Sequence, residues 1–177
     1  MTAVLEKFVE QSSFRAKVGQ VYYLSSSDRV LASVSAELLG WSLSLHRHVR
    51  LPKEFSSVQV SSVLSGITER NSSKEIVFQC NLSSVSSDLL ARGVVNMETI
   101  QFQRRAGLSA DQAKAIFNTL TTSTCLRQMS FLERFTTNLT DLSAVNPRVL
   151  YEVLVKLYRL RLYRTLFTSE QLRFYSL

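Results

Sequence analysis

Two histidines separated by one residue, His46 and His48, are the arrangement in this sequence that most nearly suggests chemistry. Side chains at positions i and i+2 of a strand share a face, so both imidazoles could bind one metal ion. A zinc site needs three or four ligands, however, and the sequence has no third histidine. Cys80 and Cys125 lie in other segments. We therefore expect two solvated histidines on a strand and no metal site.

Motifs of phosphate binding and nucleophilic catalysis are lacking from the sequence. Its five glycines occur singly, so none forms a glycine-rich loop that could wrap a phosphate. No Walker or dinucleotide-binding motif occurs, and no spacing favours a set of nucleophile, base and acid. We therefore predict a protein that is not an enzyme and needs no cofactor.

Two short signatures alternate three times along the chain and predict how its elements are arranged. The first is an apolar residue, two further residues and valine, followed shortly by two adjacent apolar residues; its copies begin at Leu31, Leu82 and Leu142. The second is an apolar residue, a hydroxyl residue and, three positions after the hydroxyl, glutamine; its copies begin at Phe55, Leu108 and Phe167. Copies of one signature lie 51 to 60 residues apart, and regular spacing of this kind is typical of repeat proteins.

Each copy of the second signature has the form of a helix capping box. In that motif the hydroxyl accepts a hydrogen bond from the helix, and the glutamine reaches back to the amide of the cap residue. The three pairs are Ser56 with Gln59, Ser109 with Gln112, and Thr168 with Gln171. A further helix start is predicted at Asn146 and Pro147, which suit the N-cap and the first helical position.

Six short apolar runs predict strands, and in five of them apolar residues alternate with residues of another kind, as in a strand with one buried face. The runs are residues 21–23, 49–51, 76–78, 100–102, 129–131 and 160–162. A predicted helix separates one run from the next, so the repeating unit is a strand, a turn and a helix.

The strand half of this unit resembles the leucine-rich repeat, in which apolar residues recur as L-x-x-L-x-L before an Asn or Cys bend. The residues that carry the resemblance are Met97-x-x-Ile100-x-Phe102, Leu126-x-x-Met129-x-Phe131, Leu157-x-x-Leu160-x-Leu162 and the bend Gln79-Cys80-Asn81-Leu82. The alternation of two repeat types is similar to the ribonuclease-inhibitor class, which also forms the sensor half of intracellular immune receptors. The resemblance implies an α/β fold, a right-handed solenoid with a parallel β-sheet on its concave face and helices on its convex face.

The resemblance covers about residues 18–177, and residues 1–17 are expected to form an N-terminal capping helix. The repeats would contribute about six strands, with the last repeat incomplete. The sequence departs from the pattern at Thr165, where Asn is usual, and in an insertion at residues 132–141. Because the C-terminal residues are apolar and no repeat follows them in this chain, we expect self-association, a partner or further repeats at that end.

Composition and targeting signals indicate the cytoplasm. No run approaches the roughly 18 apolar residues of a membrane span, and Glu6 and Lys7 interrupt the N-terminal segment where a signal peptide needs apolar residues. Two cysteines are too few for a disulfide framework. The nucleus remains an alternative, and an extracellular location is less favoured although three glycosylation sequons occur, at Asn71, Asn81 and Asn138.

In the leucine-rich-repeat arrangement the residues between buried strand positions point to the concave face, which is the usual recognition surface of solenoids. The predicted partner-binding residues are Tyr22, His48, Arg50, Gln79, Gln101, Gln103, Gln128, Arg159, Arg161 and Tyr163. These residues form a surface with an uncharged, glutamine-rich middle and basic flanks. The preferred interpretation is a non-catalytic module that binds a protein partner, as an adaptor, a receptor fragment or an inhibitor.

Nucleic-acid binding is the alternative interpretation. The chain has a net charge of +7, and its last repeat combines four basic residues with two tyrosines. The basic residues are Lys156, Arg159, Arg161 and Arg164. Only this repeat is strongly basic, which makes protein binding the better interpretation.

Overall fold

The computed structural model describes residues 32–103, 106–132, 140–163 and 165–174, and in them the chain has a mixed α/β fold. The strands are β1 (His48–Leu51), β2 (Glu75–Phe78), β3 (Thr99–Gln103), β4 (Gln128–Leu132), β5 (Thr140–Asp141), β6 (Arg159–Tyr163) and β7 (Thr165–Leu166). The helices are α3 (Ala36–Leu43), α4 (Ser57–Arg70), α5 (Ser87–Val94), α6 (Ala110–Leu120), α7 (Pro147–Leu154) and α8 (Ser169–Phe174). Within this described part, no helix has the length and apolar character needed to cross a membrane.

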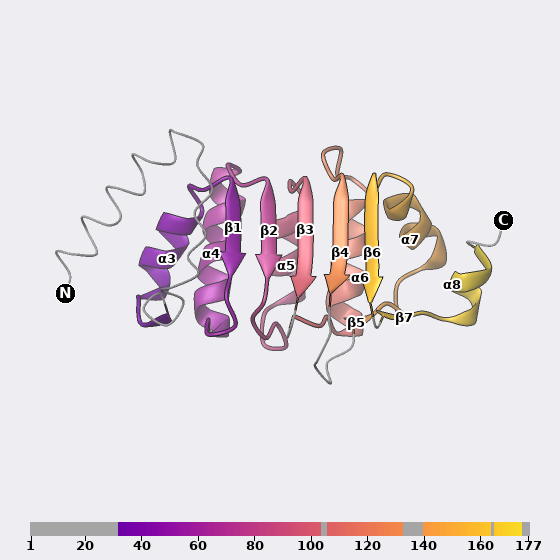
Figure 1. Ribbon diagram of the computed structural model, residues 1–177, viewed down its shortest axis with the longest axis horizontal. Coiled ribbons are helices and arrows are strands. Elements are labelled where there is room, and N and C mark those ends of the chain that lie inside the picture. The colour runs from indigo at the N-terminus through magenta and orange to yellow at the C-terminus, as the bar shows by residue number, and fades with distance from the viewer. Residues whose placement is uncertain (1–31, 104–105, 133–139, 164, 175–177) are drawn as a thin grey trace.

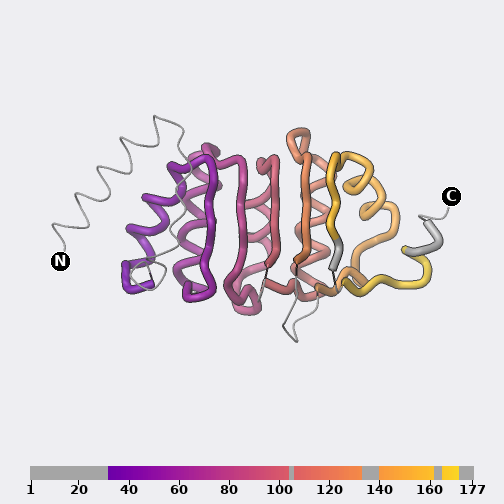
Figure 2. The backbone as a smooth tube through the Cα atoms, in the orientation of Figure 1, coloured from indigo at the N-terminus to yellow at the C-terminus, as the bar shows by residue number. Residues whose placement is uncertain are grey.

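Five strands form one parallel sheet whose order, β1-β2-β3-β4-β6, follows the order of the chain. A helix lies between each of these strands and the next, and Figure 1 shows α4, α5 and α6 together on one side of the sheet. Figure 2 follows the same path as a tube, and its colour changes steadily from one strand to the next. The other side of the sheet, which we call the open face, carries no helix among the described residues.

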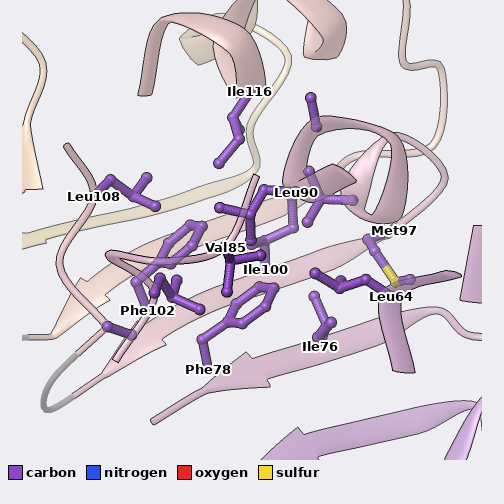
Figure 3. Close-up of a cluster of buried hydrophobic side chains, with 14 of the residues drawn as sticks. Leu64, Ile76, Phe78, Val85, Leu90, Met97, Ile100, Phe102, Leu108 and Ile116 are labelled. Atoms are coloured by element: carbon purple, nitrogen blue, oxygen red, sulfur yellow. The ribbon is translucent and has the colours of Figure 1, made fainter. Parts of the chain in front are cut away.

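The core is built from residues that occupy matching positions on neighbouring strands. The sheet register aligns Phe78, Phe102 and Phe131 in one row, and successive ring centroids are 5.1 Å apart with nearly parallel planes. Figure 3 shows Phe78 and Phe102 among apolar side chains between the sheet and the helices. This row confirms the predicted strand phase. Leu162 has the next position in the row, but its side chain lies outside the described residues.

The predicted capping boxes are confirmed. At the start of α4 and of α6, the serine hydroxyl accepts a hydrogen bond from the glutamine backbone, and the glutamine side chain accepts one from the serine backbone. Thr168 and Gln171 make the same reciprocal pair at the start of α8. Asn146 caps α7 by accepting a hydrogen bond from the backbone of Arg148, with Pro147 at the first helical position.

The same glutamines also join each second signature to the first signature that precedes it. The Nε2 group of Gln112 donates to the backbone oxygens of Leu82 and Val85, at 2.7 and 2.9 Å. Gln171 donates in the same way to Leu142 and Val145, at 2.7 Å each. Gln59 donates to Ala32 and Val34, at 2.9 Å each. All three glutamines are buried, so each side chain closes a helix start and fixes a loop 25 to 30 residues earlier in the chain.

Several sequence-based expectations need correction or fall outside the described residues. Five of the six predicted strands are present, while the predicted strand 21–23 and the capping helix 1–17 lie outside the described residues. The insertion at residues 132–141 contributes an unexpected strand, because Thr140 and Asp141 (β5) pair in parallel with Thr165 and Leu166 (β7). His46 precedes β1 instead of sharing a strand with His48, so the two histidines do not occupy one strand face.

Candidate binding surface

Alternation along the strands places every second residue on the open face, and the parallel register aligns these residues in rows. One row runs from His48 through Glu75, Thr99 and Gln128 to Arg159. The next row contains Arg50, Val77, Gln101, Ser130 and Arg161. Gln79 directly follows β2 and Gln103 is the last residue of β3, while the backbone of Tyr163 is aligned with Leu132. The strand phase of the predicted site is therefore right, while Tyr22 and the Tyr163 side chain lie outside the described residues.

A chain of hydrogen bonds crosses this surface from β1 to β3 and back. The Nε group of Arg50 donates to Oε1 of Gln79 at 3.0 Å. Nε2 of Gln79 then donates to Oε1 of Gln103 at 3.1 Å, and Nε2 of Gln103 donates to Oε1 of Gln101 at 2.7 Å. Each amide thus accepts one hydrogen bond and donates one, which fixes the orientation of all three glutamines.

This series of hydrogen bonds ends at the carboxylate of Glu75. One oxygen of Glu75 accepts a hydrogen bond from Nε2 of Gln101 at 3.1 Å, and the other lies 2.8 Å from Nδ1 of His48. The hydrogen bonds therefore run in one direction from a guanidinium cation to a carboxylate, an arrangement in which each bond polarises the next. We call this set the polar network; it consists of Arg50, Gln79, Gln103, Gln101, Glu75 and His48.

The polar network surrounds Val77, which the register places beside Arg50 and Gln101. Along the chain, Val77 lies between Glu75, the first residue of β2, and Gln79, which directly follows β2. Val77 is half-buried, so its apolar side chain contributes to the surface that a ligand would meet. Because the surrounding amides are already oriented, a ligand would lose little free energy in ordering them. Glu75 is not among the predicted binding residues, although the strand alternation alone places it on this face.

The opposite half of the open face is basic. Arg159 and Arg161 are exposed on β6, and neither guanidinium pairs with a carboxylate in the part of the chain that the structure describes. Between them and the network, Ser130 is buried, and its hydroxyl has no hydrogen-bond partner among the described residues. The sequence predicted basic flanks on both sides, but Glu75 balances the flank formed by His48 and Arg50. Uncompensated positive charge is therefore concentrated on β6.

Lys156 does not belong to the basic surface on which the nucleic-acid alternative depends. Its Nζ group donates hydrogen bonds to the backbone oxygens of Leu120 (3.4 Å), Thr121 and Ser123 (3.3 Å). Leu120 and its C-cap Thr121 end α6, and Ser123 follows two residues later. At this end of a helix the last carbonyls have no partner within the helix, and a cation is favoured. The interacting residues are 33 to 36 positions apart, so no local sequence pattern could have indicated this contact.

The capping role of Lys156 can be tested by Lys156→Met, which keeps the aliphatic stem and removes the donors. We expect the free energy of unfolding to fall by about 1 to 2 kcal/mol, because hydrogen bonds to a charged group are lost at the end of α6. Lys114→Met on the exposed side of α6 is the matched control and is expected to change it by less than about 0.5 kcal/mol. Chemical denaturation measures both. Equal stability of the two variants, with nucleic-acid affinity lost only in Lys156→Met, would contradict this role.

In the part of the chain that the structure describes, the remaining titratable side chains are not grouped into a reactive site. Burial raises the pKa of the Cys80 thiol to about 12, so this cysteine stays protonated and is a poor nucleophile. Burial also lowers the pKa of His46 below its usual value, which favours its neutral form. Among the described residues, no three or more His, Cys, Asp or Glu side chains are grouped so that they could hold a metal ion.

Comparison with known proteins found no matching family model, no matching curated protein and no matching solved structure. The assignment of function therefore depends on the geometry described above.

Proposed function

We propose that this chain is a leucine-rich-repeat solenoid of the ribonuclease-inhibitor type that binds a protein partner through the open face of its sheet. The order of the strands supports the solenoid, since each strand of the sheet pairs with the next one along the chain and a helix lies between them. The recurring contact of Gln59, Gln112 and Gln171 with the preceding signature supports it further, because one structural unit is repeated three times.

The observation that carries the binding role is the oriented polar network on β1–β3, together with two arginines on β6 that have no carboxylate partner among the described residues. The network offers fixed hydrogen-bond donors and acceptors around an apolar centre, and Arg159 and Arg161 supply the side-chain type that is enriched at binding hot spots. Nothing in this surface resembles a nucleophile with its base, so the proposed activity is non-catalytic recognition. Cys80 and Cys125 are both free thiols, which suits a reducing compartment such as the cytoplasm or nucleus.

The proposal predicts that Gln103→Leu lowers the affinity of the chain for its partner without unfolding the chain. The variant keeps a side chain of similar size but interrupts the polar network between Gln79 and Gln101. With a partner captured by the wild-type chain and then purified, we expect its Kd to rise at least tenfold, while the melting temperature stays within about 2 °C. Isothermal titration calorimetry and circular dichroism provide the two measurements.

Asn118→Leu is the matched control, because Asn118 is exposed on α6 and the substitution adds a similar apolar group on the helix-covered side. It is expected to leave the Kd unchanged. A partner whose affinity falls for Asn118→Leu but not for Gln103→Leu would place recognition on the helices and would overturn the proposal.

A further inference from the structure

Strand β6 is an edge strand whose outer side is unpaired among the described residues. It pairs with β4 on one side, and the structure describes no strand on the other. The backbone amide of Arg159 donates to the oxygen of Arg127, so the N–H and C=O groups of Arg159 and Arg161 point toward β4. Those of Leu160 and Leu162 consequently point toward the unpaired edge. This edge has the geometry to accept one more strand.

A row of apolar side chains runs across all five strands on the helix-covered side of the sheet, and its last member, on β6, is not fully buried. Val49, Ile76, Ile100 and Met129 occupy the same row on the preceding strands and are at most 2% exposed. Leu160 continues the row on β6 and is 36% exposed, although the sequence predicted that it is buried. Ile76, Ile100 and Met129 each have a neighbouring strand on both sides, whereas no described strand lies on the outer side of Leu160. An added strand with an apolar residue beside Leu160 would bury it.

The positive charge of β6 on the open face indicates which side chains an added strand would need. Arg159 and Arg161 flank Leu160 and lie on the opposite side of the sheet, with no carboxylate partner among the described residues. A second copy of β6 would place its own two arginines next to these, and like charges on directly opposite residues are destabilising. Acidic residues opposite the arginines would be attracted instead. Because side chains of a strand alternate between its faces, the added strand needs acidic and apolar residues in alternation.

We propose that the outer edge of β6 binds an extended segment of a partner protein in which acidic and apolar residues alternate. The segment adds a strand to the sheet through the backbone groups of Leu160 and Leu162, its apolar residues cover Leu160, and its acidic residues pair with Arg159 and Arg161. This site shares Arg159 and Arg161 with the open face, but it uses the backbone at the edge of the sheet and none of the polar network on β1–β3, so it does not depend on recognition by that network.

The test uses the whole chain and three labelled nine-residue peptides with blocked ends. The first alternates Glu and Val, the second has the same composition in blocks, and the third alternates Lys and Val. Fluorescence anisotropy is expected to show saturable binding of the first peptide and at least tenfold weaker binding of the other two. Hydrogen exchange is expected to slow at the Leu160 and Leu162 amides when the first peptide binds, and to stay unchanged at Arg159 and Arg161.

Substitutions separate the backbone contribution from that of charge. Leu160→Pro removes an amide that faces the unpaired edge but leaves the pairing with β4, so it should abolish binding, whereas Leu160→Val should retain it within twofold.

Arg161→Glu should weaken binding at least tenfold, and Arg47→Glu, which changes net charge equally at the opposite end of the sheet, should not. Circular dichroism verifies that each variant is folded. Gln103→Leu should leave the peptide affinity unchanged, so failure of this site and failure of the open face can be told apart.

Three results would overturn the proposal. Equal affinity for the alternating and block peptides would show attraction by charge alone. A concentration-dependent dimer that Leu160→Pro dissociates would show that a second copy occupies the edge. Binding without slower exchange at Leu160 and Leu162 would place the peptide elsewhere on the chain.

Discussion

Replacing Phe102 by alanine is expected to lower the free energy of unfolding by about 3 to 5 kcal/mol, the usual loss when a large buried aromatic side chain is truncated. Phe102 stands in the middle of the aromatic row, with the rings of Phe78 and Phe131 each at a centroid distance of 5.1 Å. All three rings are at most 1% exposed. The substitution therefore removes two stacking contacts and leaves a cavity that the neighbouring side chains fill only in part. Urea denaturation followed by circular dichroism measures the loss.

Two further variants control this measurement. Phe102→Leu keeps most of the buried volume and is expected to lose clearly less stability than alanine. Val58→Ala, at an exposed position of α4, is expected to change the free energy of unfolding by less than about 0.5 kcal/mol. A loss below about 1 kcal/mol for Phe102→Ala would mean that the aromatic row is not part of the core.

Replacing Gln112 by glutamate is expected to lower the free energy of unfolding by about 2 to 6 kcal/mol at pH 7, or about 1 to 3 kcal/mol for each of two buried acceptors that lose a donor. Glutamate can still accept the hydrogen bond from Ser109 at the capping box. It cannot donate to the backbone oxygens of Leu82 and Val85 while it is ionised. The variant thus preserves the local cap and removes only the contact between the two signatures.

The stability of this variant should also depend on pH. Burial beside two carbonyl oxygens raises the pKa of the introduced carboxyl above its unfolded value of about 4.3, because only the protonated acid can donate a hydrogen bond. A raised folded-state pKa gives stability that is complete below the unfolded pKa and is lost as the pH rises through the folded pKa. The deficit relative to wild type is therefore expected to be smaller at pH 4 than at pH 7.

Gln128→Glu is the matched control, because the substitution changes the net charge by the same amount at a half-buried position on the open face. It is expected to cost less than about 1 kcal/mol and to show no comparable recovery at low pH. If the two variants lose equal stability, the contact of Gln112 with the earlier signature contributes nothing specific.

The part of the binding surface that sequence could predict is the set of residues on one face. Alternation along β1, β2, β3, β4 and β6 assigned His48, Gln101 and Arg159 to the open face correctly, because the faces of a strand alternate regardless of its neighbours. The distribution of charge on that face could not be predicted. Glu75 contacts His48 only when β1 and β2 lie side by side. The hydrogen bonds from Arg50 to Glu75 likewise form only when β3 lies next to β2.

The sequence by itself determined the elements that depend on residues within a few positions of one another. The capping boxes at Ser56 and Ser109, the proline start of α7 and the phase of five strands were all predicted, since hydrogen bonds across three residues and a two-residue alternation are local properties. The tertiary structure decided the contacts between residues about 25 to 36 positions apart. It gave Gln112 a second role, assigned Lys156 to the end of α6, paired β5 with β7 and left Leu160 partly exposed. Contacts of this kind leave no short-range pattern, because they form only when successive units pack against each other.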